Sequence, residues 1–186
     1  MPRGEKYHKR TIEVNTFDYD EQRLVVEGCL IDIRFQEFRK VTGETNPPGI
    51  LHHMVIRLLV NKKTLCVEDL HVEMPTVPEQ DCMEAINSLA PLKGTAIIKG
   101  FTSKVKSLAG KGQGCSHLVA LLTSMGSSTL QGYAAYMHNE PPGRFSEAIV
   151  RMLEDTCYTL RGDGPLMLLM KKQNEDRRRA RLTSAG

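Results

Sequence analysis

The stretch Leu24-Val-Val-Glu-Gly-Cys-Leu-Ile-Asp-Ile-Arg-Phe35 decides the fold class. It is rich in β-branched residues and partly alternates apolar with polar positions, which is typical of a strand with one buried face. A second stretch of this kind, His53-Met-Val-Ile-Arg-Leu-Leu-Val60, is followed by the polar turn Asn61-Lys-Lys63 and by a further predicted strand from Thr64 to Met74, with Val67, Leu70 and Val72. The two runs around this turn predict a β-hairpin.

The segments on either side extend this pattern. Arg10 to Val14 reads as another strand, and the paired prolines in the segment from Thr42 to Gly49 predict a loop, because proline cannot donate to a sheet. After Pro78 the apolar period becomes helical. The spacing predicts a short helix that includes Cys82 and ends at Pro91, and further helices over 101–108, 116–138, 145–160 and 165–181. Strands followed by helices predict an α+β fold, with an antiparallel sheet, helices packed on one face and a helical C-terminus.

Length and composition favour one globular domain. The 186 residues are 40% hydrophobic and 25% charged, which excludes global disorder. We predict a single α+β domain over 1–165, followed by a C-terminal helix over 166–186 with a basic end. The net charge of +3 is too small to indicate nucleic-acid binding, and much of the excess lies between Arg177 and Arg181.

Two absences in the sequence bear on location. No run approaches the ~18 apolar residues that a spanning helix needs, and the N-terminal residues do not resemble a signal peptide. The five cysteines are an odd number, so free thiols are expected in place of a disulfide framework. We therefore predict a cytoplasmic protein without a membrane span.

The run Gly114-Cys115-Ser116-His117-Leu118 predicts a chemical site at a helix start. The glycines at 110, 112 and 114 break regular structure, so a helix begins at or just after Cys115. Unpaired amides at a helix N-terminus favour a thiolate, and His117 can transfer protons or ligate a metal. Cys115 and His117 are the predicted catalytic residues. In the alternative reading Cys115 is a small buried side chain and His117 a surface cap.

Other donor atoms lie further up the chain. His52 and His53 are adjacent on an extended segment, so only one of them can face a given site. Cys82 opens a predicted helix. Mixed nitrogen and sulfur ligands suit Zn²⁺ or iron, and long intervals between the residues mean that the fold must assemble the site. The predicted metal ligands are His52, His53, Cys82, Cys115 and His117.

The chain resembles an uncharacterised bacterial family of unknown function over nearly its whole length. The shared features are a His-His-Met start to a strand, a cysteine after a proline-containing loop, a Leu-x-Gly segment and a Gly-Cys-Thr/Ser-His-Leu signature. In this sequence they are His52 to Met54, Pro78 to Cys82, Leu92 to Gly94, Gly114 to Leu118, and a matching Gln131 beyond them. This resemblance implies that the chain is related to the members of that family, and it does not imply a particular activity.

A more remote resemblance covers about Ile50 to Met125. In plan it is similar to the iron-sulfur cluster scaffold proteins of the IscU and NifU type, which implies a scaffold-like core over about 50–138. The resemblance places His52 or His53 at the first ligand loop, Cys82 at the second and Cys115 at the third. The chain departs from the scaffolds by having histidine at the first position, and by placing a histidine two residues after Cys115.

These observations leave three functions open. The first is a Zn- or Fe-binding protein of scaffold-like fold, serving as a metal-dependent catabolic or accessory enzyme on an unidentified small molecule or protein. The second is a metal-free thiol enzyme, in which Cys115 transfers an acyl or sulfur group with a histidine as its base. The third is an interaction module, in which the apolar half of the C-terminal helix forms a homo-oligomer.

Overall fold

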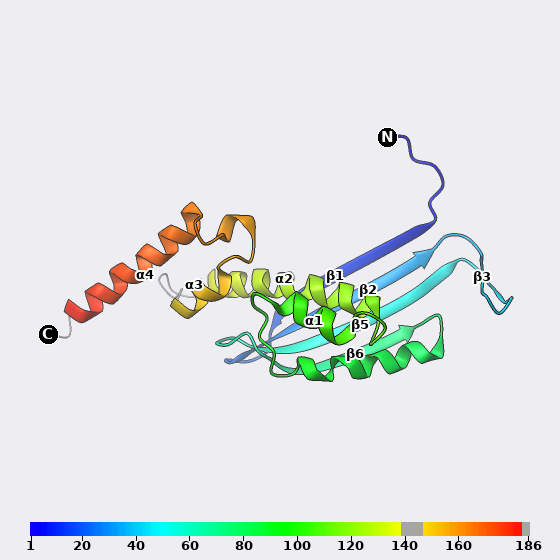
Figure 1. The fold of residues 1–186 in the computed structure, drawn as a ribbon, viewed down its shortest axis with the longest axis horizontal. Coiled ribbons are helices and arrows are strands. Elements are labelled where there is room, and N and C mark those ends of the chain that lie inside the picture. Colours follow the sequence, from blue (N-terminus) through cyan, green and yellow to red (C-terminus); the bar gives the residue numbers. More distant parts are fainter. Residues whose placement is uncertain (139–146, 184–186) are drawn as a thin grey trace. The chain divides into compact units, whose positions relative to one another are not determined.

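The computed structural model describes residues 1–138 and 147–183. It is an α+β fold, as predicted, built on a four-stranded antiparallel sheet in the order β1-β2-β5-β6 (Figure 1). The chain divides into two compact units, residues 1–97 with 101–129 and residues 98–100 with 130–186. The predicted domain over 1–165 stays a prediction. The sheet strands are β1 (His8–Asp18), β2 (Arg23–Arg34), β5 (Gly49–Asn61) and β6 (Val67–Thr76).

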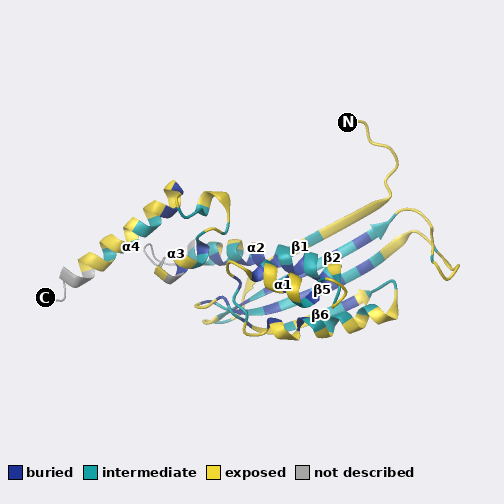
Figure 2. Cartoon of the chain, viewed as in Figure 1, coloured by how far each residue is buried: buried dark blue, intermediate teal, exposed yellow. Residues whose placement is uncertain are grey.

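The sheet of the first unit buries one face. Leu24, Val26 and Leu30 of β2 are buried, and the residues between them are only half-buried. β5 continues the same alternation in register, with Leu30 opposite Met54 and Gly28 opposite Ile56. Figure 2 shows this alternation along both strands. The alternation of apolar and polar residues in the sequence therefore matches the alternation of buried and half-buried side chains in the strands.

Helix α2 (Ser116–His138) packs on the buried face through its first half. A Cβ atom at Gly28 would lie 2.6 Å from the sulfur of Met125, so glycine permits the close approach of helix and strand. A Cβ atom at Gly126 would lie 2.8 Å from the Phe101 ring of α1 (Phe101–Ala109), which packs against α2 in turn. The tight contact with β2 fixes the height of α2 above the sheet.

Two connecting segments differ from the sequence-based expectation. The predicted loop over 42–49 contains β4 (Thr45–Asn46), which pairs with β3 (Phe38–Arg39) in a separate two-stranded ladder. The predicted short helix is the 3-10 helix η1 (Gln80–Leu92), which includes Pro91. Strands of two residues have no hydrophobic period, so the sequence pattern does not predict this ladder.

The second unit is helical in its described part. It contains the end of α2, α3 (Glu147–Leu153), the short η2 (Tyr158–Leu160) and α4 (Pro165–Thr183). The single helix predicted over 145–160 is wrong from Glu154 onward, since Asp155 adopts a left-handed φ of 60° and its amide bonds to the Leu160 carbonyl. Residues 145 and 146 of that prediction lie outside the described residues.

Apolar residues are both buried and exposed in this unit. The buried side chains come from the end of α2 and from α3 and α4: Tyr133, Ile149, Val150, Leu153 and Met167. Leu166, Leu168 and Leu169 of α4 are exposed. None of the helices in the described residues combines the length and the apolarity that crossing a membrane requires.

Candidate metal centre

Asp32 is a carboxylate on the buried face of the sheet. It shares this face with Leu24, Val26 and Leu30, and its exposure is only 2%. In register, Asp32 lies between Arg10 of β1 and His52 of β5, so three strands present polar side chains in one row. The register between β2 and β5 shifts just beyond Asp32, where a bulge separates it from Ile33. The apolar core therefore ends in a polar row at this end of the sheet.

The edge strand β1 supplies two side chains to the carboxylate. Arg10 donates from Nε to Oδ1 and from Nη2 to Oδ2, each at 2.7 Å. His8 places Nε2 3.2 Å from Oδ1. The paired bonds from Arg10 are the bidentate geometry that best fits a guanidinium to a carboxylate. They fix the orientation of Asp32 and direct Oδ2 toward the interior.

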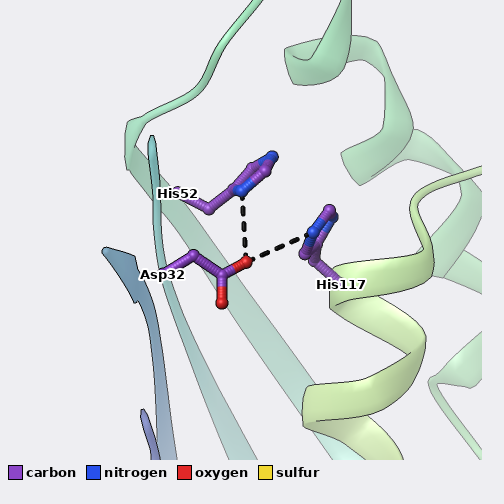
Figure 3. A group of neighbouring side chains, drawn as sticks. All are labelled: Asp32, His52 and His117. Carbon is purple, nitrogen blue, oxygen red and sulfur yellow. Dashed lines mark ion pairs between the residues drawn. The ribbon is translucent and has the colours of Figure 1, made fainter. Parts of the chain in front are cut away.

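Two histidines meet Oδ2, one from the sheet and one from α2. His52 Nδ1 lies 3.2 Å from this oxygen and His117 Nε2 lies 3.3 Å from it, as Figure 3 shows. The two rings are stacked, with centroids 3.8 Å apart and 28° between their planes. His52 is 8% exposed, and its Nδ1 has no hydrogen-bond partner in the part of the chain that the structure describes. A buried polar nitrogen in this state needs a physical explanation, and a bound cation is one.

The charge states favour a cation. Hydrogen bonds from Arg10 outweigh burial and lower the pKa of Asp32 from 3.8 to about 2. Burial lowers the pKa of His52 and of His117 below the usual 6.5, and the neighbouring His52 adds to the effect on His117. At neutral pH the site therefore holds an ionised carboxylate and two neutral imidazoles. These are the forms in which both side chains bind metals.

The spacing of the donor atoms also fits one ion. The donor atoms of Asp32, His52 and His117 all lie within 4.8 Å of one another. Ligands about 2.0 Å from a tetrahedral Zn²⁺ are about 3.3 Å apart, which matches the two distances measured to Oδ2. Because an ion lies in the plane of each imidazole that binds it, uptake requires the stacked rings to turn toward Asp32.

The structure brings together only some of the residues predicted from the sequence. His52 and His117 belong to the group, whereas His53 follows on the opposite face of β5, as expected for adjacent residues of a strand. Cys82 is half-buried in η1 and lies outside the group of Asp32, His52 and His117. A role for Cys82 or His53 as a ligand stays a prediction.

Cys115 lies where the sequence placed it, at the start of α2. Its carbonyl accepts the Val119 amide, which makes it the N-cap residue, and its sulfur lies 3.5 Å from Nδ1 of His117. The other ring nitrogen of His117 faces Asp32. Cys115, His117 and Asp32 therefore form a continuous chain of polar contacts, with the sulfur and the carboxylate on opposite sides of one imidazole.

Sequence reasoning missed Asp32, Arg10 and His8. One signal in the sequence points to Asp32. It is an even-numbered position of the strand, like Leu24, Val26 and Leu30, so the alternation places it on the same buried face. A carboxylate is rarely buried without a partner. Arg10 and His8 carry no such signal, because their roles depend on the pairing of β1 with β2.

The chain was compared with known families, proteins and structures. It matches the family described as a protein of unknown function (DUF2889) over residues 8–131 and belongs to that family. The matched range includes His8, Asp32, His52 and His117. No curated protein and no solved structure matches the chain. Membership of a family of unknown function confirms that part of the sequence-based prediction, and the similarity to iron-sulfur scaffolds stays a prediction.

Proposed function

We propose that this member of the family binds one Zn or Fe ion through Asp32, His52 and His117. The observation that carries the proposal concerns the buried Nδ1 of His52. This nitrogen lies 3.2 Å from the ionised Asp32 carboxylate, yet it forms no hydrogen bond with any of the described residues. Two neutral histidines and one carboxylate form a set that holds catalytic Zn²⁺ and non-haem Fe(II) alike.

This ligand set supports an enzymatic function over a purely structural one. Three protein ligands leave a coordination position open, whereas structural zinc sites are closed by four. A divalent ion at such a site supplies Lewis acidity and acidifies bound water. Iron-sulfur clusters are held by thiolates, and the group of Asp32, His52 and His117 contains none. We therefore favour a metal-dependent enzyme that acts on a small molecule over a cluster scaffold.

Elemental analysis and metal titration test this proposal. We expect protein purified without added metal to carry about one Zn or Fe per chain, as expected for a single three-ligand site. Because loss of an outer partner already weakens metal binding by about 10- to 100-fold, loss of a ligand in His52→Gln or Asp32→Asn should weaken it by more than about 100-fold. His53→Gln is the matched control, since it alters the adjacent residue on the other face and should bind metal normally. Equal binding by His52→Gln and His53→Gln would sink the proposal.

Within the metal site, we propose that Cys115 positions a ligand. Since its sulfur faces Nδ1 of His117 and Nε2 faces Asp32, we infer that Cys115 orients the ring and does not ligate the same ion. Outer partners of this kind select the tautomer that offers its lone pair to the metal. Cys115→Ser should then weaken metal binding far less than His117→Gln does. Equal losses would instead make Cys115 a ligand, as the sequence predicts.

The same contacts support a second candidate function, a thiol enzyme without metal. Cys115, His117 and Asp32 are arranged as a nucleophile, a base and a group that orients the base. The two functions compete for one atom, because Nε2 of His117 either donates to Asp32 or binds a metal. A metal-loaded site therefore excludes the thiol mechanism in that molecule.

Alkylation separates the two candidates. If Cys115 is a nucleophile, iodoacetamide should modify it faster than the exposed Cys157 at neutral pH in the presence of a chelator. His117→Ala should remove the difference, and Cys157→Ala should leave the alkylation rate of Cys115 unchanged. A Cys115 that reacts more slowly than Cys157 with and without chelator would contradict the thiol mechanism.

Self-association is supported by a different region. The first half of α4 exposes Leu166, Leu168 and Leu169, and exposed apolar side chains of this kind favour a contact surface. We propose a homo-oligomer formed through this surface. Light scattering of the wild type should then give a multiple of the 20.8 kDa chain, and Leu168→Glu should give the monomer. A monomeric wild type would contradict the proposal without bearing on the metal site.

A further inference from the structure

We infer that Arg10 and His8 form an anion-binding rim on the metal site, and that this rim receives a carboxylate group of the small-molecule substrate. The inference rests on the proposed metal function and adds the chemical class of the ligand. It is carried by three observations: where the site opens to solvent, which donors remain on Arg10, and how charge is distributed once a divalent ion is present.

The site opens toward the edge strand β1. The side chains of Asp32 and His52 are 2% and 10% exposed, whereas those of Arg10 and His8 are 37% and 49% exposed. His117 of α2 is 22% exposed, so the side chains around the Asp32 carboxylate are most exposed on the β1 side. A molecule that approaches the buried ligands from solvent meets Arg10 and His8 first.

Arg10 keeps donors that the protein does not use. Its Nε and Nη2 bond to Asp32, and Nη1 forms no hydrogen bond or ion pair with the described residues. A guanidinium offers five N–H donors, so the edge formed by Nη1 and Nη2 remains able to bind two oxygens in one plane. This planar pair matches a carboxylate, and for this geometry lysine is a poor substitute.

The charge of the loaded site also calls for an anion. A divalent ion adds two positive charges to Arg10, and Asp32 supplies a single negative charge against them. Histidines that ligate a metal do so as neutral imidazoles, so His52 and His117 add no charge to the loaded site. The first turn of α2 contains no acidic residue, so its amides add further positive potential. An anionic ligand would offset part of this net positive charge at the point where solvent reaches the site.

Cobalt substitution with acetate as the probe tests this inference. Wild-type protein loaded with Co²⁺ is titrated with acetate, with inorganic phosphate and with chloride at constant ionic strength, and visible absorption reports changes at the metal. We expect a saturable response to acetate and none to chloride. Arg10→Gln should weaken acetate binding by about tenfold, as expected for loss of hydrogen bonds from a charged donor. His8→Gln should weaken it less, and Lys9→Gln, which removes a charge from the opposite face of β1, should leave it unchanged.

The outcomes separate the inference from the function on which it rests. A wild type that binds no cobalt overturns the metal function, and the inference with it. Cobalt binding without an acetate response, or equal acetate affinity in all variants, overturns the inference alone. Phosphate that binds more tightly than acetate and depends on Arg10 overturns the carboxylate assignment. If Arg10→Gln does not fold or hold cobalt, His8→Gln decides: weakened acetate binding supports the rim, and unchanged binding overturns it.

Discussion

Two charged clusters lie on opposite faces of the same sheet. The covered-face cluster, beneath α2, consists of Asp32, Arg10, His8, His52 and His117. The open-face cluster consists of Glu27, Arg57, His71 and Glu73, where Arg57 bonds to both carboxylates. Asp32 is almost fully buried, whereas the side chains of Glu27 and Glu73 are 33% and 43% exposed. Similar residue types therefore occupy two very different environments within one sheet.

This difference in burial shows which cluster lowers the stability of the fold through desolvation of a charged group. An exposed ion pair contributes between zero and about 1 kcal/mol and needs no further explanation. A buried carboxylate is expensive to desolvate, and its partners often only offset that cost. The covered-face cluster also stacks two imidazoles and leaves a buried nitrogen without a hydrogen-bond partner among the described residues. Packing alone does not account for such a group, which is why we place the function there.

The largest effect is expected when Asp32 loses its charge. Asp32→Asn breaks the pair with Arg10 and leaves poorly matched donors around a buried amide, so unfolding should need about 3 kcal/mol less free energy. The matched change on the other face, Glu27→Gln, should cost less than about 1 kcal/mol. Urea unfolding of both variants at neutral pH measures the difference. Similar losses in the two variants would remove the contrast between the clusters.

The second effect concerns pH. The folded-state pKa of Asp32 is lowered from 3.8 to about 2, so its contribution is complete above about 3.8 and is lost as pH falls toward 2. This shift corresponds to about 2 kcal/mol. The lowered pKa values of His52 and His117 act in the same direction from a higher pH, because below 6.5 the unfolded chain binds protons that the folded one does not.

Unfolding of wild type and Asp32→Asn across this range measures the effect. The stability gap between them should be constant near neutral pH and should shrink as pH falls below about 4, where the wild type gains the proton that the variant never binds. A gap that stays constant down to pH of about 2 would show that the carboxylate is not held as the structure indicates.

The sequence predicts the sheet better than it predicts the site. Strand alternation at Leu24 to Leu30 reports burial directly, and helical spacing after Gly114 located α2 with its first residues. The site depends on which strands pair and in what register. The sequence of one strand does not specify its partner, so the pairing of Arg10 with Asp32 cannot be predicted from the sequence. His52 is predicted as a ligand because histidine is a common metal-binding residue. A single carboxylate in a strand resembles an ordinary solvent-facing position, so the sequence pattern does not single out Asp32.

A smaller effect is expected where α2 meets the sheet. In Gly28→Ala the new Cβ atom would lie 2.6 Å from the sulfur of Met125, which is fully buried, so the helix or the methionine must move. Overpacking of this kind should cost about 1–2 kcal/mol. Because His117 is on the same helix, metal binding should weaken as well. Gly4→Ala, which meets nothing within 4 Å, is the control. Unchanged metal affinity in Gly28→Ala would show that His117 tolerates movement of α2.

The smallest effect is expected on the open face. Arg57 bonds to Glu27 at 2.6 Å and also to Glu73, yet its own side chain is 42% exposed. Arg57→Gln should therefore reduce stability by less than about 1 kcal/mol, and high salt should reduce the loss further. Metal binding should not change, since Arg57 points away from α2. Unfolding at low and high salt measures the first effect, and cobalt titration measures the second. A loss as large as that of Asp32→Asn would mean that a partner covers the open face and excludes water from it.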